Sequence, residues 1–293
     1  MNILVTGGSG FVGSRLIKKL IERDDIKSII SIDNYFSGYK KNEIKSNKKI
    51  IYIKENTKNI NKIEFLKNKK FDLLYHFGEY SRIAVSFEEP NIVFESNLTG
   101  TYQVLEFCRI NNCKLIYSGS TSIFGNNMKD QHGSPYSWSK SKNIELIHNY
   151  NKWFNLKFTI VYFSNVYGAG QICSGKYATV IGIFEEQYRN KKPLTVVKPG
   201  TQKRDFTHID DTINGIILSS FKGDGDGYII RAGIQYSIIE IAKMFTNNIK
   251  FIENQRGNRN ESSGNFDKIL ELGWKANNNI EEYIKNIKLS LKL

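Results

Sequence analysis

The chain has 293 residues, 40% of them hydrophobic, which is enough for one large domain or two intimate ones with a packed core. No apolar run approaches the ~20 residues of a membrane-spanning helix, and the start at Met1 has neither a basic segment nor a cleavage site, so a cytoplasmic protein without a secretory signal is expected. The net charge is +13, but the lysines are dispersed and no nucleic-acid-binding motif is present, which argues against a nucleic-acid partner.

Short apolar strands alternate with amphipathic helical stretches through the first half of the chain. Strands are predicted at 3–5, 29–32, 50–53, 72–76, 114–118 and 159–163, and helices at 13–23, 97–110 and 139–154. In the second helix the expected buried positions are Leu98, Tyr102, Leu105 and Phe107. This alternation predicts an α/β fold built on a Rossmann-type doubly wound parallel sheet.

The pattern becomes irregular after about residue 165. Residues 1–165 are therefore predicted to form the Rossmann domain, with a later segment near 205–230 returning to it. Residues 166–293 are expected to form mainly a smaller lobe that covers the carboxyl edge of the sheet, where ligands bind in such folds. Three cysteines, Cys108, Cys113 and Cys173, have no metal-ligand spacing and are interpreted as reduced thiols, so no metal site is predicted.

A glycine-rich turn, Gly7-Gly-Ser-Gly10-Phe-Val-Gly13, connects the first predicted strand to the first helix. Glycines at these places let a pyrophosphate approach the helix N-terminus, where free N–H groups and the helix dipole favour anions. Asp33 ends the next strand, 20 residues beyond Gly13. A carboxylate there accepts hydrogen bonds from ribose hydroxyls and repels a 2′-phosphate. The motif predicts a dinucleotide site that prefers NAD to NADP.

Tyr136 and Lys140 form a Y-x-x-x-K step at the start of a predicted helix, so both side chains lie on one helical face. Sixteen residues upstream of Tyr136, Ser120 follows the strand that ends near Ser118. Tyrosine is too weak an acid to ionise at neutral pH on its own, but a nearby lysine and a nicotinamide cation would favour the phenolate. Such a base can remove a hydroxyl proton while hydride leaves the same carbon, and the serine can hydrogen-bond the reacting oxygen. Ser120, Tyr136 and Lys140 are the predicted catalytic residues.

With these motifs the sequence resembles the NAD-dependent nucleotide-sugar epimerase/dehydratase family of extended short-chain dehydrogenases/reductases, from Thr6 to about Trp274. UDP-glucose 4-epimerases are the best-known members. The resemblance is carried by the glycine turn and the Ser-Tyr-Lys set, by Asn165-Val-Tyr-Gly168, Arg204-Asp-Phe206 and Arg256-Gly257, and by the late packing motif Leu272-Gly-Trp274. It implies NAD as cofactor, a nucleotide sugar as substrate, most commonly a UDP-sugar, and no membrane partner.

The motifs and the resemblance together assign the site residues. The cofactor set is Gly7, Gly10, Phe11, Val12, Gly13, Asp33, Asn34, Asn56, Thr57, Phe77, Gly78, Asn97, Ser118, Tyr136 and Lys140. The substrate set is Ser81, Ser120, Ser122, Tyr136, Asn165, Thr179, Arg204 and Arg256. By resemblance, Asn165 contacts the substrate diphosphate and Arg204 clamps it, because a guanidinium suits bidentate binding of phosphate.

The resemblance also implies a homodimer in which the helices at 97–110 and 139–154 of each subunit pair. The second helix carries Tyr150, Trp153 and Phe154 near its end. These aromatic residues are compatible with such an interface and equally with burial inside one subunit.

The expected reaction is 4-epimerisation through a transient 4-keto sugar. The family's 4,6-dehydratases have acidic residues directly after the catalytic Ser/Thr, whereas this chain has Thr121 and Ser122, which disfavours dehydration. Glu79 stands where the family usually has a small residue. Either it pairs with Arg82 and shapes the pocket, or it contacts substrate or acts as an extra acid/base.

Three alternatives remain open. A 4-dehydrogenase or keto-sugar reductase would use the same triad with net turnover of the cofactor. A dehydratase would require Glu79 to supply the missing acid. A non-catalytic NAD-binding scaffold is the alternative of another class.

Overall fold

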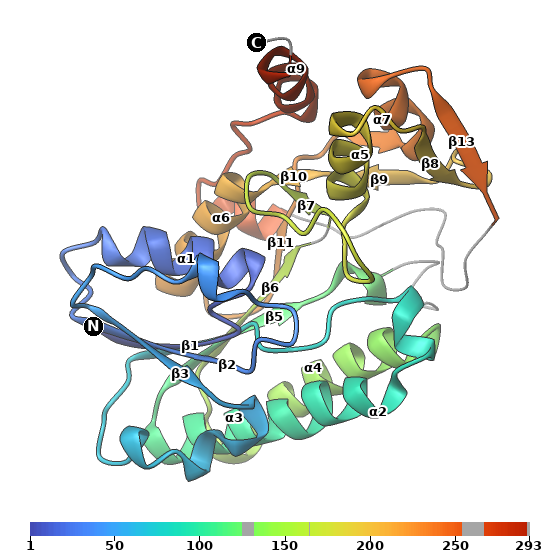
Figure 1. The fold of residues 1–293 in the computed structure, drawn as a ribbon. Helices are drawn as coiled ribbons and strands as arrows, with labels where there is room; N and C mark the ends of the chain where they lie inside the picture. The colour runs from blue at the N-terminus through green and yellow to red at the C-terminus, as the bar shows by residue number, and fades with distance from the viewer. Residues whose placement is uncertain (125–131, 164, 254–266, 292–293) are drawn as a thin grey trace.

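The computed structural model describes residues 1–124, 132–163, 165–253 and 267–291 (Figure 1). At its centre lies a seven-stranded sheet in which every pair of neighbours is parallel. In the order in which they lie side by side, its strands are β11 (Gly225–Ile230), β6 (Phe158–Phe163), β5 (Lys114–Gly119), β4 (Leu73–His76), β1 (Asn2–Thr6), β2 (Ser28–Asp33) and β3 (Ile50–Lys54). The chain runs outward from β1 to β3 and then returns to β4, so the strand order reverses between β1 and β4. The predicted Rossmann-type class is confirmed.

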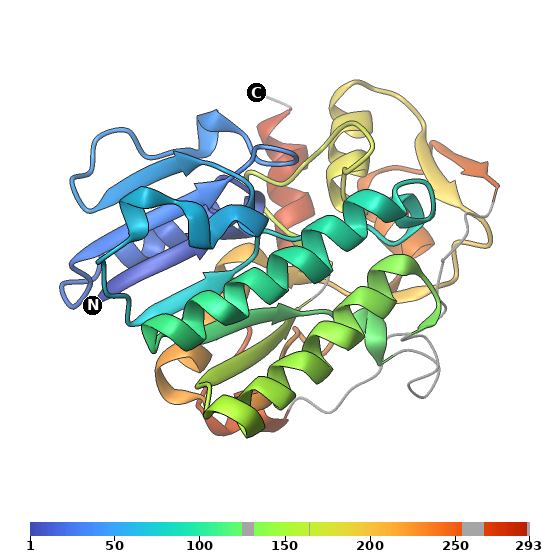
Figure 2. The ribbon, with the colours of Figure 1, turned by 90° about the horizontal axis from the view of Figure 1, so that it is seen from below.

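Helices cover both faces of this sheet (Figures 1 and 2). One face carries α1 (Phe11–Ile21) and α6 (Ile209–Lys222), which pack against each other. The other carries α2 (Pro90–Val93), the π-helical turn η5 (Phe94–Thr99), α3 (Gly100–Asn111) and α4 (Pro135–Phe154). Short 3-10 turns lie at 40–42, 57–62, 64–66, 84–87 and 121–123. Each face of the sheet has its own apolar core, formed by side chains of the strands and of the helices that cover that face.

The strands lie where the apolar runs predict them, whereas the helices have other bounds than predicted, and Leu98, which was expected to be buried, is only partly buried. Helix α4 begins at Pro135 rather than Ser139, because Ser134 caps it by accepting from the Ser137 N–H at 3.0 Å and proline suits the first helical position. The prediction that Tyr102 is buried is wrong, since 45% of this residue is exposed. The face of α3 that packs on the sheet runs through Thr101, Val104, Leu105 and Cys108, and Tyr102 points about 100° away from it.

A smaller lobe stands over the carboxyl edge of the sheet. It consists of α5 (Val180–Arg189), β8 (Leu194–Val197), α7 (Ile238–Phe245), β13 (Ile249–Ile252) and α9 (Ile280–Ser290), with the short strands β7 (Val166–Tyr167), β10 (Thr207–His208), β9 (Lys203–Asp205) and β12 (Gln235–Ser237) connecting it to the sheet. It has a separate apolar core that includes Phe184, Ile241, Phe245 and Ile284. Between its two halves the chain returns to the main sheet through α6 and β11, and α8 (Asp267–Glu271) packs on β11.

The described helices include none that is both long and apolar enough to cross a lipid bilayer.

Candidate active site

Two connected cavities open at the carboxyl ends of β1, β4 and β5, where the strand order reverses. The larger has a volume of about 410 Å³ and the smaller about 280 Å³. Residues shared by both are Gly7, Gly10, Phe36, Ser37, Phe77, Glu79 and Tyr80. The smaller lobe closes the larger cavity from the far side through residues 165–166, 172 and 177–181. An elongated ligand can therefore extend from one cavity into the other.

The glycine turn forms the floor where the two cavities meet. Gly7 has a φ of +72°, and a Cβ there would lie 2.7 Å from the backbone of Phe77 and Gly78. A Cβ on Gly13 would lie 2.2 Å from the Gly7 carbonyl oxygen, so only glycine lets α1 start this close to the turn. Helix α1 has no side-chain cap at Gly10, which leaves its first N–H groups directed at the cavity. This arrangement fits a pyrophosphate.

Asp33 lies at the end of β2 and lines the smaller cavity with Asn34, Asn56 and Thr57. Its carboxylate accepts the Ser9 N–H at 2.9 Å and the Tyr35 N–H at 2.7 Å, one on each oxygen. Burial raises the pKa of Asp33, and these two hydrogen bonds oppose that rise. Each oxygen keeps a lone pair for a ribose hydroxyl. The glycine turn and Asp33 thus fit a dinucleotide without a 2′-phosphate.

Ser120 and Tyr136 face the larger cavity from two different elements. Tyr136 lies in the first turn of α4, is 7% exposed, and its hydroxyl has no hydrogen-bond partner among the described residues. The Oγ of Ser120 follows β5 and accepts the Ser122 N–H at 3.2 Å, which leaves its own proton to donate. The two hydroxyl groups are therefore open to a ligand in this cavity.

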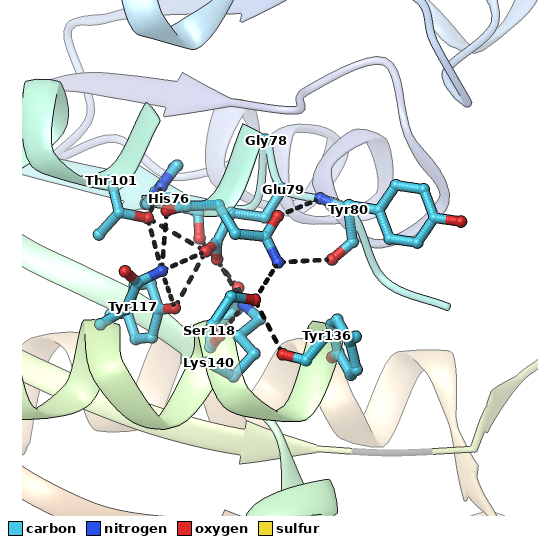
Figure 3. Close-up of polar contacts among 12 residues, drawn as sticks. His76, Gly78, Glu79, Tyr80, Thr101, Tyr117, Ser118, Tyr136 and Lys140 are labelled. Carbon is cyan, nitrogen blue, oxygen red and sulfur yellow. Dashed lines mark hydrogen bonds and ion pairs between the residues drawn. The ribbon is translucent and has the colours of Figure 1, made fainter. Parts of the chain in front are cut away.

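Lys140 projects from α4 one turn after Tyr136, lines the larger cavity and lies beside Glu79 (Figure 3). Its ammonium group pairs with the Glu79 carboxylate and donates to the Ser118 carbonyl at 2.6 Å. Only 3% of the Lys140 side chain and 2% of the Glu79 side chain are exposed. Of the two readings of Glu79, the one in which it pairs with Arg82 is wrong, because Glu79 pairs with Lys140 on α4 and the Arg82 guanidinium donates to the Tyr177 and Ser81 carbonyls.

Arg82, which is partly buried, connects the two walls of the larger cavity. Its guanidinium donates to the Tyr177 carbonyl at 2.8 Å and to the Ser81 carbonyl at 3.0 Å, and it has no carboxylate partner among the described residues. Burial lowers its pKa. Close by, the hydroxyl of Tyr177 and the ammonium of Lys176 bind Glu89 at 2.9 and 2.8 Å. The contact between Arg82 and Tyr177 was not predicted from the sequence, since the two residues are nearly a hundred positions apart. The polar run after β4 was the one signal that pointed to it.

The remaining predicted cofactor residues lie mostly along the two cavities. Phe11, Val12 and Ser118 line the larger cavity, Gly78 lines the smaller and Phe77 lines both. Asn97 lines neither, because its amide accepts the Tyr80 N–H at 2.7 Å and donates to Ser139 at 3.0 Å inside the fold. Asn97 thus supports the wall of the site from behind.

The predicted substrate residues divide into two groups. Ser81, Asn165 and Thr179 line the larger cavity, and Asn165 also donates to the Asp205 carbonyl at 3.0 Å. Ser122 is buried behind the wall, and Arg204, whose guanidinium donates to the Lys203 carbonyl at 2.8 Å, lines neither cavity. Arg256 lies outside the described residues.

The chain matches the model of the NAD-dependent epimerase/dehydratase family over residues 3–230. It is 28% identical to a putative UDP-glucose 4-epimerase of Methanocaldococcus jannaschii, over 97% of this chain and 96% of that protein. Its fold is similar to that of the UDP-glucose 4-epimerase of Thermotoga maritima solved with UDP-glucose, with a TM-score of 0.88, 26% identity, and coverage of 100% and 99% of the two chains. A dTDP-glucose 4,6-dehydratase of Streptomyces venezuelae solved with NAD has a TM-score of 0.90, 19% identity, and coverage of 100% and 97%. The last likeness bears on the fold alone.

Proposed function

The chain belongs to the NAD-dependent epimerase/dehydratase family, with NAD as its cofactor, and we propose that it is a nucleotide-sugar 4-epimerase acting on a UDP-hexose. The observation that carries the proposal is the composition of the larger cavity. Ser120 and Tyr136 present free hydroxyl groups there, whereas among the described residues that line it only Glu79 has a carboxyl group. Because that carboxylate is paired with Lys140, it is not available as the acid that loss of water from the sugar would require. This favours epimerisation over dehydration.

The cofactor would extend along both cavities, with its pyrophosphate at the glycine turn and one ribose on Asp33. When bound, NAD supplies the group that accepts hydride from the sugar carbon and returns it. The glycine turn and Asp33 hold and orient it, and the smaller lobe excludes water from the larger cavity. UDP is proposed as the nucleotide because the Thermotoga maritima relative was solved with UDP-glucose.

The chain's own chemistry on the sugar is proton transfer at the 4-hydroxyl group. Tyr136 removes this proton as the keto form of the sugar is made and gives it back when the hydroxyl group is restored. The Ser120 hydroxyl group donates to the same sugar oxygen and stabilises the charge that develops there. Lys140, fixed beneath Tyr136, supports the phenolate by its positive charge.

We further propose that the protein is a homodimer formed through α3 and α4. Large apolar side chains are exposed along these two helices, among them Tyr102 (45%), Ile110 (65%), Trp153 (60%) and Phe154 (49%). Tyr150, in contrast, is 5% exposed and belongs to the subunit's own core. A cluster of exposed apolar groups on one layer of helices is typical of a protein interface.

The test is to incubate the purified protein with UDP- and GDP-sugars without added cofactor and to follow the sugars by NMR and the nicotinamide absorbance in parallel. We expect the C4 epimer without net formation of NADH. Net NADH or an accumulating keto sugar would replace the proposal by a dehydrogenase, reductase or dehydratase. Tyr136→Phe should lower turnover by about 10²–10⁴-fold while NAD stays bound, whereas Tyr188→Phe, in the outer lobe, should not change it. Normal turnover in Tyr136→Phe would contradict the assigned mechanism.

A further inference from the structure

The Glu79 carboxylate is buried three residues after β4, beside the Lys140 side chain of α4 (Figure 3). We propose that Glu79 is a positioning residue for the reaction, which fixes the Lys140 ammonium group against the end of β5 and compensates its charge beside Tyr136. The inference rests on the proposed roles of Tyr136 and Lys140 and adds a residue that the glycine and Y-x-x-x-K motifs do not contain.

The carboxylate of Glu79 is surrounded by donors from the chain itself. Its Oε1 accepts from Thr101 at 3.1 Å, from Tyr117 at 3.0 Å and from Asn143 at 3.0 Å, and its Oε2 accepts from Lys140. An ionised carboxylate offers about four acceptor sites. Oε1 has more candidate donors than its two lone pairs can accept, whereas Oε2 accepts from Lys140 alone among the described residues. Because only 2% of the side chain is exposed, Glu79 is held as the buried counter-ion of Lys140.

A directed row of hydrogen bonds supports Glu79 from the cofactor side. Thr101 donates its only hydroxyl proton to Glu79, so the neutral His76 ring carries its proton on Nε2, and its Nδ1 accepts from the Thr6 hydroxyl group at 2.7 Å; Thr6 Oγ1 in turn accepts the Gly78 N–H at 3.1 Å. His76 Nε2 then donates to Thr101 Oγ1 at 3.0 Å, and the Thr101 hydroxyl group donates to Glu79. Burial lowers the pKa of His76 to about 4, so its ring is neutral and carries the single proton that this row requires. Glu79 is thereby held from β1, β4 and α3 together.

This support fixes the position of Lys140. Its ammonium group has three protons, of which one is donated to Glu79 and one to the Ser118 carbonyl. Without the carboxylate only that carbonyl would hold it strongly, since the Ser118 hydroxyl group is 3.5 Å away and donates to the His76 carbonyl. A lysine side chain has four rotatable bonds, and a charge that moves by about 1 Å at an active site can cost on the order of 10²-fold in rate.

The charge balance around Tyr136 also depends on Glu79. The titratable groups packed around Tyr136 and Lys140 are His76, Glu79, Tyr80, Arg82, Tyr117 and Tyr177. His76 is neutral, and burial raises the pKa of Tyr117 well above its usual value, so the charges are Lys140, Arg82 and Glu79. Among the described residues that line the larger cavity, neutralising Glu79 removes the one carboxylate and leaves the cations Lys140 and Arg82. This favours the phenolate at lower pH.

The test compares Glu79→Gln and Glu79→Asp with Glu145→Gln, which removes an exposed glutamate paired with Lys142 on the same helix, α4. In Glu79→Gln we expect kcat to fall about 10–100-fold, KM to change less than about threefold, and the acid limb of kcat/KM to shift down by roughly one pH unit. Glu79→Asp should recover part of kcat, and Glu145→Gln should match the parent. If kcat per folded molecule and the pH profile are unchanged in Glu79→Gln, Glu79 is merely structural and the proposal is wrong.

A stability cycle tests the pairing when the single variant folds poorly or no nucleotide sugar is turned over. Urea unfolding is measured for the parent, Glu79→Leu, Lys140→Met and the double variant. Removing one partner of a buried ion pair leaves an uncompensated charge, whereas removing both does not. We expect the double variant to unfold at higher urea than either single variant. Additive effects would overturn the pairing, and failure of every nucleotide sugar with an intact cycle would count against the proposed function alone.

Discussion

The close approach of α1 to the glycine turn allows a sharp prediction for Gly13→Ala. The added Cβ would lie 2.2 Å from the Gly7 carbonyl oxygen and 2.9 Å from two further backbone atoms, where real contacts are not shorter than 3.0 Å. The helix start must therefore move by about 0.8 Å, and neither neighbour is a flexible side chain. Overpacking of this kind costs typically 1–3 kcal/mol of unfolding free energy. The same movement displaces the N–H groups that face the pyrophosphate, so NAD affinity should fall at least about tenfold, or ~1.4 kcal/mol.

A matched control for this substitution is Gly100→Ala at the start of α3. The nearest atom to its added Cβ is 3.7 Å away, an ordinary contact, and alanine is favoured over glycine in helices by up to about 1 kcal/mol. Urea unfolding and calorimetric NAD titration of both variants give the comparison. We expect Gly13→Ala to be destabilised and Gly100→Ala to be neutral or stabilised, with parent-like NAD binding. Parent-like stability and NAD binding in Gly13→Ala would refute the reasoning.

Three further predictions concern Asp33, His76 and the exposed aromatic residues at the end of α4. Asp33→Ala should lower the affinity for NAD and reduce the ratio of the NAD affinity to the NADP affinity. An unchanged ratio in a competition titration would exclude the assigned role of Asp33. The free energy of unfolding should fall as the pH drops from about 6.5 towards 4, because His76 in the folded protein, with a pKa of about 4, stays unprotonated where the unfolded chain binds a proton. His76→Gln should reduce this dependence of the unfolding free energy on pH. An unchanged pH dependence in the variant would contradict the assignment. Trp153→Glu with Phe154→Glu should convert a dimer into monomers in light scattering, whereas a parent protein that is already monomeric would disprove the proposed interface.

Local patterns were sufficient to predict six of the seven strands of the sheet, all but β11, and much of the cavity lining. The strands are short runs of apolar residues, which periodicity identifies. The spacing of the glycines alone indicates a turn in which side chains would collide with the backbone. Tyr136 and Ser120 lie near strand or helix ends that the same patterns locate. Their side chains consequently line the larger cavity, beside the turn.

Contacts between segments that are distant in the sequence could not be predicted from such local patterns. Glu79 meets Lys140 across 61 residues of sequence, and its direction depends on how β4 ends and where α4 passes. Asn97 was expected at the cofactor, but the π-helical turn η5 places it inside the fold, where Tyr80 and Ser139 use its amide. Neither outcome can be obtained from periodicity, because each depends on side-chain directions set by packing.

The hydrogen bonds that converge on Glu79 restrict how this site can evolve. Replacing Glu79 with alanine would remove, in one mutation, the acceptor of three buried neutral donors and the counter-ion of a buried ammonium group. Such groups are costly when left unsatisfied, so that intermediate is disfavoured even if a fully remodelled site would be stable. A lineage would have to change Lys140 or its surroundings first and lose the carboxylate afterwards. The neighbours of Glu79 therefore make its loss unfavourable. The order in which substitutions occur determines which variants of this site can arise.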